Sequence, residues 1–139
     1  MAEQTRTIQM LLPGGTVEEA RVSLAAADGA CRLSLTHQGR TLHAEASDYF
    51  EALCHIREVL EQDGTRLLCY GASRNVYPSG MARDMGAGLR AYRLTPGRHS
   101  SGAELQDIFA TGPDVLPATV EEQRRYRDEW LVSIGVLDA

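Results

Sequence analysis

The sequence predicts an α+β fold in which an antiparallel sheet, formed by a meander at residues 21–46 and further strands, packs against two helices. The meander segment alternates between apolar and polar side chains and contains two turn signals. Residues 49–62 and 120–134 have the spacing of apolar side chains that is typical of amphipathic helices. The chain has 139 residues, a length that suits one hydrophobic core, so we expect a single domain over residues 1–139.

Two turns determine how the meander strands pair. Asp28-Gly29 is a strong signal for a type I′ turn, and Gln38-Gly39 is a weaker one. If both close two-residue hairpins, one face of the sheet is apolar throughout and Arg32 lies opposite Glu45 on the other face. The apolar pairs are Ala26 with Cys31, Leu24 with Leu33 and Val22 with Leu35, then Leu35 with Leu42, Leu33 with Ala44 and Cys31 with Ala46. A slip of one residue would destroy this agreement, so both turns predict the same register.

Capping signals mark the start of both predicted helices. Asp48 with Glu51, and Thr119 with Glu122, have the spacing of capping boxes. The apolar stripe of the first helix is interrupted by Arg57. The stripes consist of Phe50, Leu53, Cys54 and Leu60 in the first helix and of Val120, Tyr126, Trp130 and Ile134 in the second. Apolar runs at residues 7–12, 67–70, 91–94 and 105–109 predict further strands, giving roughly five to seven strands in all.

The charge balance excludes several classes of function. All 14 Lys+Arg residues are arginine, which excludes Schiff-base chemistry and a phosphate-loop lysine. A net charge of −5 argues against a general nucleic-acid-binding protein, because such proteins need a basic surface.

The start of the sequence lacks the pattern of a signal peptide, and no stretch has the length and apolarity of a membrane span. We therefore expect a cytoplasmic protein.

The cysteines and histidines do not form a recognisable metal or redox motif. Cys31, Cys54 and Cys69 are widely spaced and lie in apolar runs, which is typical of small buried side chains. The four histidines also lack the spacing of metal ligands. The sequence therefore predicts neither a metal site nor a cofactor.

Catalytic patterns are equally weak. Ser73 or Ser79 could be combined with His99 and Asp84 on paper, but no nucleophile-elbow motif surrounds either serine. The carboxylates near the end of the chain alternate with arginines, as on a solvated helix face. We therefore do not expect an enzyme.

Residues 71–88 are the segment that most strongly suggests a function. The segment is long and has no clear periodicity, and loops of this length are usually functional or disordered. Its interleaved hydrophobic and polar side chains favour an ordered loop. Methionine, aromatic residues and arginine are enriched at protein contact sites. The candidate partner-binding residues are Arg74, Asn75, Tyr77, Ser79, Met81, Arg83 and Asp84.

Two other interpretations of this segment stay open. In the first, it is a compact surface loop in which Arg83 and Asp84 satisfy backbone groups and Tyr77 packs against the sheet edge. In the second, its glycines hold an anion or a nucleotide together with Arg74 or Arg83, which would make the protein a small regulator or enzyme.

The run from Leu67 to Gly86, LLCYGASRNVYPSGMARDMG, is distinctive. Together with Leu89–Leu94 and the final helix, it resembles small, uncharacterised bacterial proteins of the polymorphic-toxin immunity type. The resemblance covers Leu67 to Ile134, about half of the chain, and rests on no catalytic motif. It implies a cytosolic protein that binds and occludes a cognate toxin domain.

The leading hypothesis is therefore a non-enzymatic protein-binding module that covers a toxin's active site with residues 73–84. The acidic net charge favours a basic partner. The alternative is the anion- or nucleotide-binding protein described above, and a third hypothesis is a structural subunit of a homo-oligomer.

Overall fold

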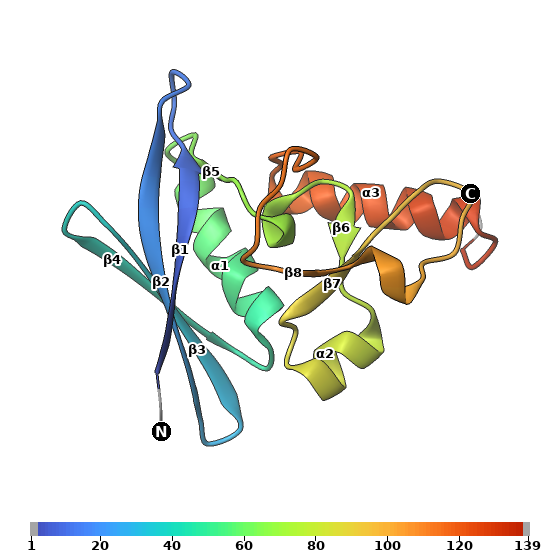
Figure 1. Cartoon of the computed structure of the whole chain (residues 1–139), viewed down its shortest axis with the longest axis horizontal. Helices are drawn as coiled ribbons and strands as arrows, with labels where there is room; N and C mark the ends of the chain where they lie inside the picture. Colours follow the sequence, from blue (N-terminus) through green and yellow to red (C-terminus); the bar gives the residue numbers. More distant parts are fainter. Residues whose placement is uncertain (1–2, 138–139) are drawn as a thin grey trace.

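The computed structural model describes residues 3–137 and has an α+β fold with two antiparallel sheets, as the sequence predicts for the fold class (Figure 1). The first sheet has the strand order β4-β3-β2-β1-β5 and the second has the order β6-β7-β8. The first sheet consists of β1 (Gln4–Leu11), β2 (Val17–Ala27), β3 (Ala30–His37), β4 (Arg40–Ala46) and β5 (Arg66–Leu67). The second consists of β6 (Val76–Tyr77), β7 (Arg90–Arg93) and β8 (Leu105–Asp107).

Three α-helices and two short 3₁₀-helices complete the structure. They are α1 (Tyr49–Glu61), α2 (Gly80–Gly86), α3 (Val120–Ser133), η1 (Tyr70–Ala72) and η2 (Gly102–Glu104). In Figure 1, α1 lies between the first sheet and the part of the chain that contains the second sheet, α2 and α3. Within residues 3–137, no helix is long and apolar enough to cross a membrane.

The predicted register of the meander is confirmed. All six predicted apolar pairs form, and Arg32 donates from Nε to Glu45 Oε2 at 2.7 Å on the opposite face. Asp28 and Gly29 have φ values of 54° and 76°, and Gln38 and Gly39 have 49° and 79°. Positive φ at both central residues defines a type I′ turn, whose twist matches that of the flanking strands. Most of the apolar face, including Val22, Leu24, Leu33 and Leu35, is buried.

Helix α1 covers this apolar face. Asp48 caps its first turn, because Oδ1 accepts a hydrogen bond from the Glu51 amide at 2.8 Å. Helix α1 packs against β3 and β4; its residues Phe50, Leu53 and Ile56 are completely or almost completely buried, and burial of each such side chain contributes about 1.5–3 kcal/mol. The reciprocal capping box forms at α3, between Thr119 and Glu122.

The second half of the chain differs from the sequence-based expectation in two respects. The strands form two sheets, because after β5 the chain leaves the first sheet: the Tyr70 and Gly71 amides donate to Ala110 and Ile108 carbonyls beyond β8. The predicted strand at residues 67–70 is therefore only two residues long and leads into η1. Residues 71–88, expected to be an irregular loop, contain β6 and α2.

A buried polar junction joins α1, the segment from η1 to β6, and α3. Arg57 on α1 is 2% exposed and donates to the Gly71 carbonyl at 3.2 Å, the Ala118 carbonyl at 2.9 Å and Gln123 Oε1 at 2.6 Å. Gln123 on α3 is 1% exposed. Its Nε2 donates to the carbonyls of Gly71, Ser73 and Val76 at 3.0, 2.9 and 2.8 Å. Burial lowers the pKa of the Arg57 guanidinium.

The three cysteines are buried, as the sequence predicts. Burial raises the pKa of Cys54 and of Cys69 to about 11, and it also raises the pKa of Cys31. The thiolate is the reactive form of cysteine, so a raised pKa makes these thiols unreactive. The three cysteines therefore serve as small hydrophobic side chains of the core.

Gln123→Leu is expected to lower the free energy of unfolding by about 3 kcal/mol, because three carbonyls and the Arg57 guanidinium lose a hydrogen-bond partner in a dry site. Urea denaturation measures the change. Arg125→Leu on the exposed face of the same helix is the matched control and should stay within about 0.5 kcal/mol of the wild type. Equal stability of the two variants would contradict the role assigned to Gln123.

The native thiols are expected to react very slowly with dithionitrobenzoate. At about pH 8, a thiol of pKa about 11 is thiolate in only about one molecule in a thousand. Guanidinium denaturation should release all three thiols at the rate of ordinary cysteines. Thr111→Cys, at an exposed position, supplies a fast-reacting control in the folded protein, and native cysteines that react at its rate would show that the core is open.

Candidate functional site

Helix α2 lies against the start of α1 through Arg83. The Arg83 guanidinium is 5.1 Å from the centre of the Phe50 ring and 5.7 Å from that of Tyr77. It also lies 3.8 Å from an oxygen of Asp48 and 3.7 Å from one of Glu51. Arg83 is therefore the inward-facing residue of α2 and is already surrounded by aromatic and acidic groups of the same chain.

Hydrogen bonds at its two ends also fix α2. Ser79 Oγ accepts a hydrogen bond from the Ala82 amide at 3.0 Å and caps the first turn. At the other end, Ala87 adopts a left-handed conformation with φ 56°, and its carbonyl accepts from the Tyr49 amide at 2.8 Å. The end of α2 is thus bonded to the beginning of α1, which fixes the side of the helix that faces solvent.

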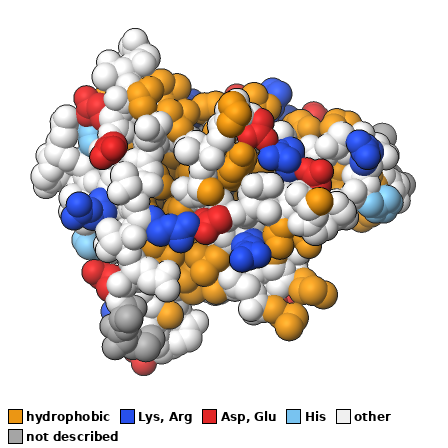
Figure 2. Space-filling model, in the orientation of Figure 1, with side chains coloured by type: hydrophobic (Ala, Val, Ile, Leu, Met, Phe, Trp, Pro, Cys, Tyr) orange, Lys and Arg blue, Asp and Glu red, His pale blue; other side chains and the backbone are white. Residues whose placement is uncertain are grey.

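The solvent-facing side of α2 carries two methionines. Met81 is 70% exposed and Met85 is 84% exposed. The two are four positions apart in the sequence, so they lie on one face of the helix. Figure 2 shows hydrophobic side chains projecting at the lower right, where Figure 1 places α2. Asp84, also exposed, lies between them in sequence. We call Met81 and Met85 the methionine pair.

A hollow of about 430 Å³ opens beside the start of α2. Its lining combines aromatic and aliphatic side chains with a few polar groups, and we call it the aromatic hollow. The Arg127 guanidinium lies 4.7 Å from the centre of the Tyr77 ring at its wall. The lining residues are Tyr77, Pro78, Ser79, Gly80, Tyr92, Leu94, His99, Ser100, Arg127, Trp130 and Leu131.

Hydrogen bonds to α3 hold the loop that forms one wall of the hollow. Trp130 Nε1 donates to the Arg98 carbonyl at 2.9 Å, and the Gly97 amide donates to Ser133 Oγ at 2.8 Å. Tyr126 donates to the Leu94 carbonyl at 3.2 Å. The hollow is thus built from segments far apart in the sequence and held by bonds from one helix.

The candidate residues of segment 71–88 lie in three different settings. Tyr77 and Ser79 line the aromatic hollow, although Tyr77 is only 8% exposed and packs edge-on against Phe50 at 5.0 Å. Met81 and Asp84 face solvent on α2, whereas Arg83 faces inward. The remaining two lie toward β7 and α3. Arg74 stacks over the Tyr126 ring. The Asn75 backbone carbonyl accepts a hydrogen bond from the Leu94 amide, and its side-chain Oδ1 accepts one from the Ser73 hydroxyl.

Several residues of this surface are not among the partner-binding candidates that the sequence predicts. Met85 was part of the segment but not among the candidates, and its exposure depends on which face of α2 points inward. Tyr92, His99, Arg127 and Trp130 come from β7, a loop and α3. The sequence places Trp130 in the apolar stripe of the final helix, Tyr92 in the predicted strand 91–94 and His99 in the weak serine triad, and predicts a partner contact for none of them.

The geometry does not assemble the anion cradle that the glycines and arginines suggest. Gly71 is tightly enclosed, since a Cβ there would lie 2.8 Å from a Leu53 methyl carbon. A Cβ on Gly88 would lie 2.6 Å from a carboxylate oxygen of Asp48. These glycines allow close packing, and Arg74 and Arg83 contact aromatic rings in different places.

Ser73 and Ser79, the two serines considered as catalytic nucleophiles in the sequence, both have structural roles. Ser73 is completely buried; its hydroxyl donates to Asn75 Oδ1 at 2.7 Å and accepts from the Leu116 amide at 2.9 Å. Ser79 is occupied as the cap of α2. Within residues 3–137, no group of three or more His, Cys, Asp and Glu side chains has the arrangement of a metal site.

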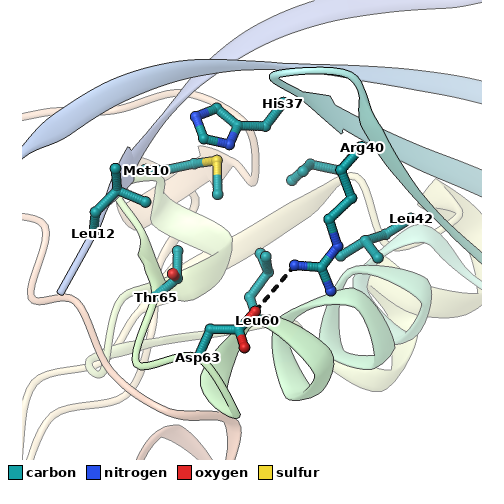
Figure 3. A pocket seen from close by; sticks show the side chains of 9 residues that line it. Met10, Leu12, His37, Arg40, Leu42, Leu60, Asp63 and Thr65 are labelled. Carbon is teal, nitrogen blue, oxygen red and sulfur yellow. Dashed lines mark hydrogen bonds and ion pairs between the residues drawn. The ribbon is translucent and has the colours of Figure 1, made fainter.

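A smaller cavity, of about 180 Å³, lies between the first sheet and the end of α1 (Figure 3). Met10, Leu12, Leu35, Leu42 and Leu60 supply apolar walls. An ion pair between Arg40 Nη1 and Asp63 Oδ2, at 3.0 Å, crosses one side, as the dashed line in Figure 3 shows. The ion pair connects the start of β4 to the end of α1.

The comparisons with known proteins do not assign the chain to a family. No family model matches it, and no curated protein has a similar sequence. The arrangement of the α2 surface and the aromatic hollow therefore carries the functional argument.

Proposed function

We propose that this chain is a non-enzymatic protein-binding module whose contact surface consists of the methionine pair and the adjoining aromatic hollow. The observation that carries the proposal is the exposure of Met81 and Met85, at 70% and 84%. Ser79 and Gly80 line the hollow and lie at the start of α2, so the two features form one continuous surface.

The methionine pair supports a protein partner because its exposure has no role in the fold. Arg83 and the two caps hold α2 in place, and the methionines face away from them. Covering both side chains would contribute about 3–6 kcal/mol before the costs of association are subtracted. Methionine also adapts its shape to a partner surface, which suits a contact that must cover an irregular target.

The hollow supports a particular kind of contact. Tyr77, Tyr92 and Trp130 would surround an apolar or aromatic side chain of the partner, and such anchors in pockets dominate binding energies. The charged group at the wall is Arg127, which favours a carboxylate beside that anchor. The net charge of −5 acts at longer range and accelerates the approach of a partner that is basic overall. A toxin domain occluded by this surface fits the immunity-type resemblance.

A second candidate function, binding of a small planar acid in the aromatic hollow, is favoured by one observation. Arg127 stacks on Tyr77 at the wall of a hollow whose volume lies within the range of small-molecule sites. Arg127→Leu would abolish such binding, whereas substitution of the methionine pair would leave it unchanged. Thermal shifts with a panel of aromatic carboxylates and nucleotides distinguish the two candidates.

Replacement of both Met81 and Met85 by serine is expected to weaken partner binding at least tenfold, because two buried side chains are lost from the contact. Affinity capture from an extract of the native cell identifies the partner, and calorimetry with the purified pair measures the change. The melting temperature should move by no more than a few degrees. Tyr77 and Arg83 are unsuitable for this test because both are part of the packing between α1 and α2.

Val17→Ser provides the matched control, since Val17 is an exposed hydrophobic residue on β2, in the other sheet. This variant should bind the partner as the wild type does. A stoichiometric partner that binds the serine variants of α2 and the wild type equally would contradict the proposed surface.

A further inference from the structure

The outer edge of β4 is the free edge of the first sheet. Within residues 3–137, β4 pairs only with β3, through a regular register from His37↔Arg40 to Cys31↔Ala46. Figure 1 shows β4 at the edge of the first sheet, with the hairpin at its start on the side of the molecule away from the second sheet. A free strand edge presents backbone donors and acceptors that can pair with another strand.

The turn geometry determines which backbone groups are free. In a two-residue hairpin the pair next to the turn is hydrogen-bonded, and hydrogen-bonded and non-bonded pairs alternate from there. His37↔Arg40 is that pair, so Arg40, Leu42, Ala44 and Ala46 bond to β3. The amides and carbonyls of the alternate residues, Thr41, His43 and Glu45, therefore point outward along the free edge.

This edge lacks most of the devices that block strand pairing. Between Thr41 and Ala46 there is no proline, no lysine and no bulge. Arg40, turned toward Asp63, is the one charged side chain on the inner face, at the end of the strand. The inner-face residues Leu42, Ala44 and Ala46 are only partly buried, whereas their β3 partners Leu35, Leu33 and Cys31 are buried. An added strand would complete their burial.

We propose that β4 pairs with β4 of a second copy, antiparallel and about a two-fold axis at His43, to form a continuous ten-stranded sheet from two five-stranded ones. A two-fold axis perpendicular to the sheet keeps both apolar faces on the same side. Because His43 is the midpoint of Arg40–Ala46, this register pairs the whole strand, and it joins the outward-pointing groups of Thr41, His43 and Glu45.

The side chains are complementary in this register. On the solvent face, Thr41 lies opposite Glu45 of the second copy and can donate its hydroxyl to that carboxylate. On the apolar face, Leu42 lies opposite Ala44 of the second copy, a large residue against a small one, and this contact occurs twice. Glu45 is already paired with Arg32 of its own chain, and in the symmetric arrangement it faces the Thr41 hydroxyl and not another carboxylate.

An exposed valine on α1 extends the same surface. Helix α1 packs against β3 and β4. Val59, an exposed hydrophobic residue, lies seven residues after the buried Ala52 and four before Asp63, which bonds to Arg40 of β4. The last turn of α1, which carries Val59, therefore lies beside the start of β4, and in the proposed register it would face the first turn of α1 of the second copy.

Sedimentation equilibrium from low micromolar to submillimolar concentration tests the proposal, and we expect twice the monomer mass at the upper end. Hydrogen exchange read by NMR should show slowed exchange of the Thr41, His43 and Glu45 amides as the dimer forms. A monomer at every concentration would overturn the proposal, as would a dimer in which these three amides stay unprotected.

Two variants test the edge and the helix flank separately. His43→Pro removes an outward amide without breaking a bond to β3 and is expected to give a monomer, whereas His43→Thr, a good strand former, should stay dimeric. Val59→Arg places a charged side chain between the last turn of α1 and the first turn of the second copy's α1, where it would lose hydration, and should weaken dimerisation at least tenfold, which keeps the test decisive if the proline variant does not fold. The Met81→Ser, Met85→Ser protein should still dimerise, which separates this interface from the partner-binding surface. Unchanged dimerisation of both His43→Pro and Val59→Arg would overturn the proposal.

Discussion

The buried charge of Arg57 is the constraint on which the second half of the structure depends. Removing a guanidinium from water costs several kcal/mol unless hydrogen bonds replace its hydration. Here the bonded acceptors are neutral oxygens: two backbone carbonyls, from Gly71 and Ala118, and the Gln123 amide oxygen. They belong to η1, the segment before α3, and α3 itself. Because each acceptor is needed, the relative positions of these segments and α1 are determined by one side chain.

The exposed surface follows from that junction. Gln123 donates to the carbonyls of Ser73 and Val76, so β6 is fixed against α3. Tyr77, the second residue of β6, therefore faces α3 side chains across the aromatic hollow. The chain then turns into α2, which is attached mainly through Arg83 and its end caps. Since those attachments occupy one side of a short helix, Met81 and Met85 must point to solvent. Their exposure is a consequence of how α2 is held.

The first half of the fold could be predicted because its determinants are local. Asp28-Gly29 and Gln38-Gly39 lie inside the hairpins that they close, and Asp48 lies beside the helix that it caps. The second half is held by contacts between distant residues. Gln123, which binds three carbonyls about fifty residues earlier, looks in the sequence like an ordinary polar position on a solvated helix. Helix α2, from Gly80 to Gly86, is too short to show a helical period. The hollow, built from several separate segments, has no local signature at all.

The two proposed surfaces belong to different parts of the molecule: β4 is the edge of the first sheet, whereas α2 and the aromatic hollow belong to the part that contains the second sheet (Figure 1). A dimer formed through β4 would use none of the residues of the methionine pair or of the aromatic hollow. Such a dimer presents two equivalent contact surfaces, so it would bind two separate partner molecules or bridge two sites on one assembly. Simultaneous binding to an assembly raises the apparent affinity without any new contact, provided that the spacing of the sites matches that of the α2 helices. Dimerisation would then increase the avidity of a contact that depends on only two methionines and one hollow.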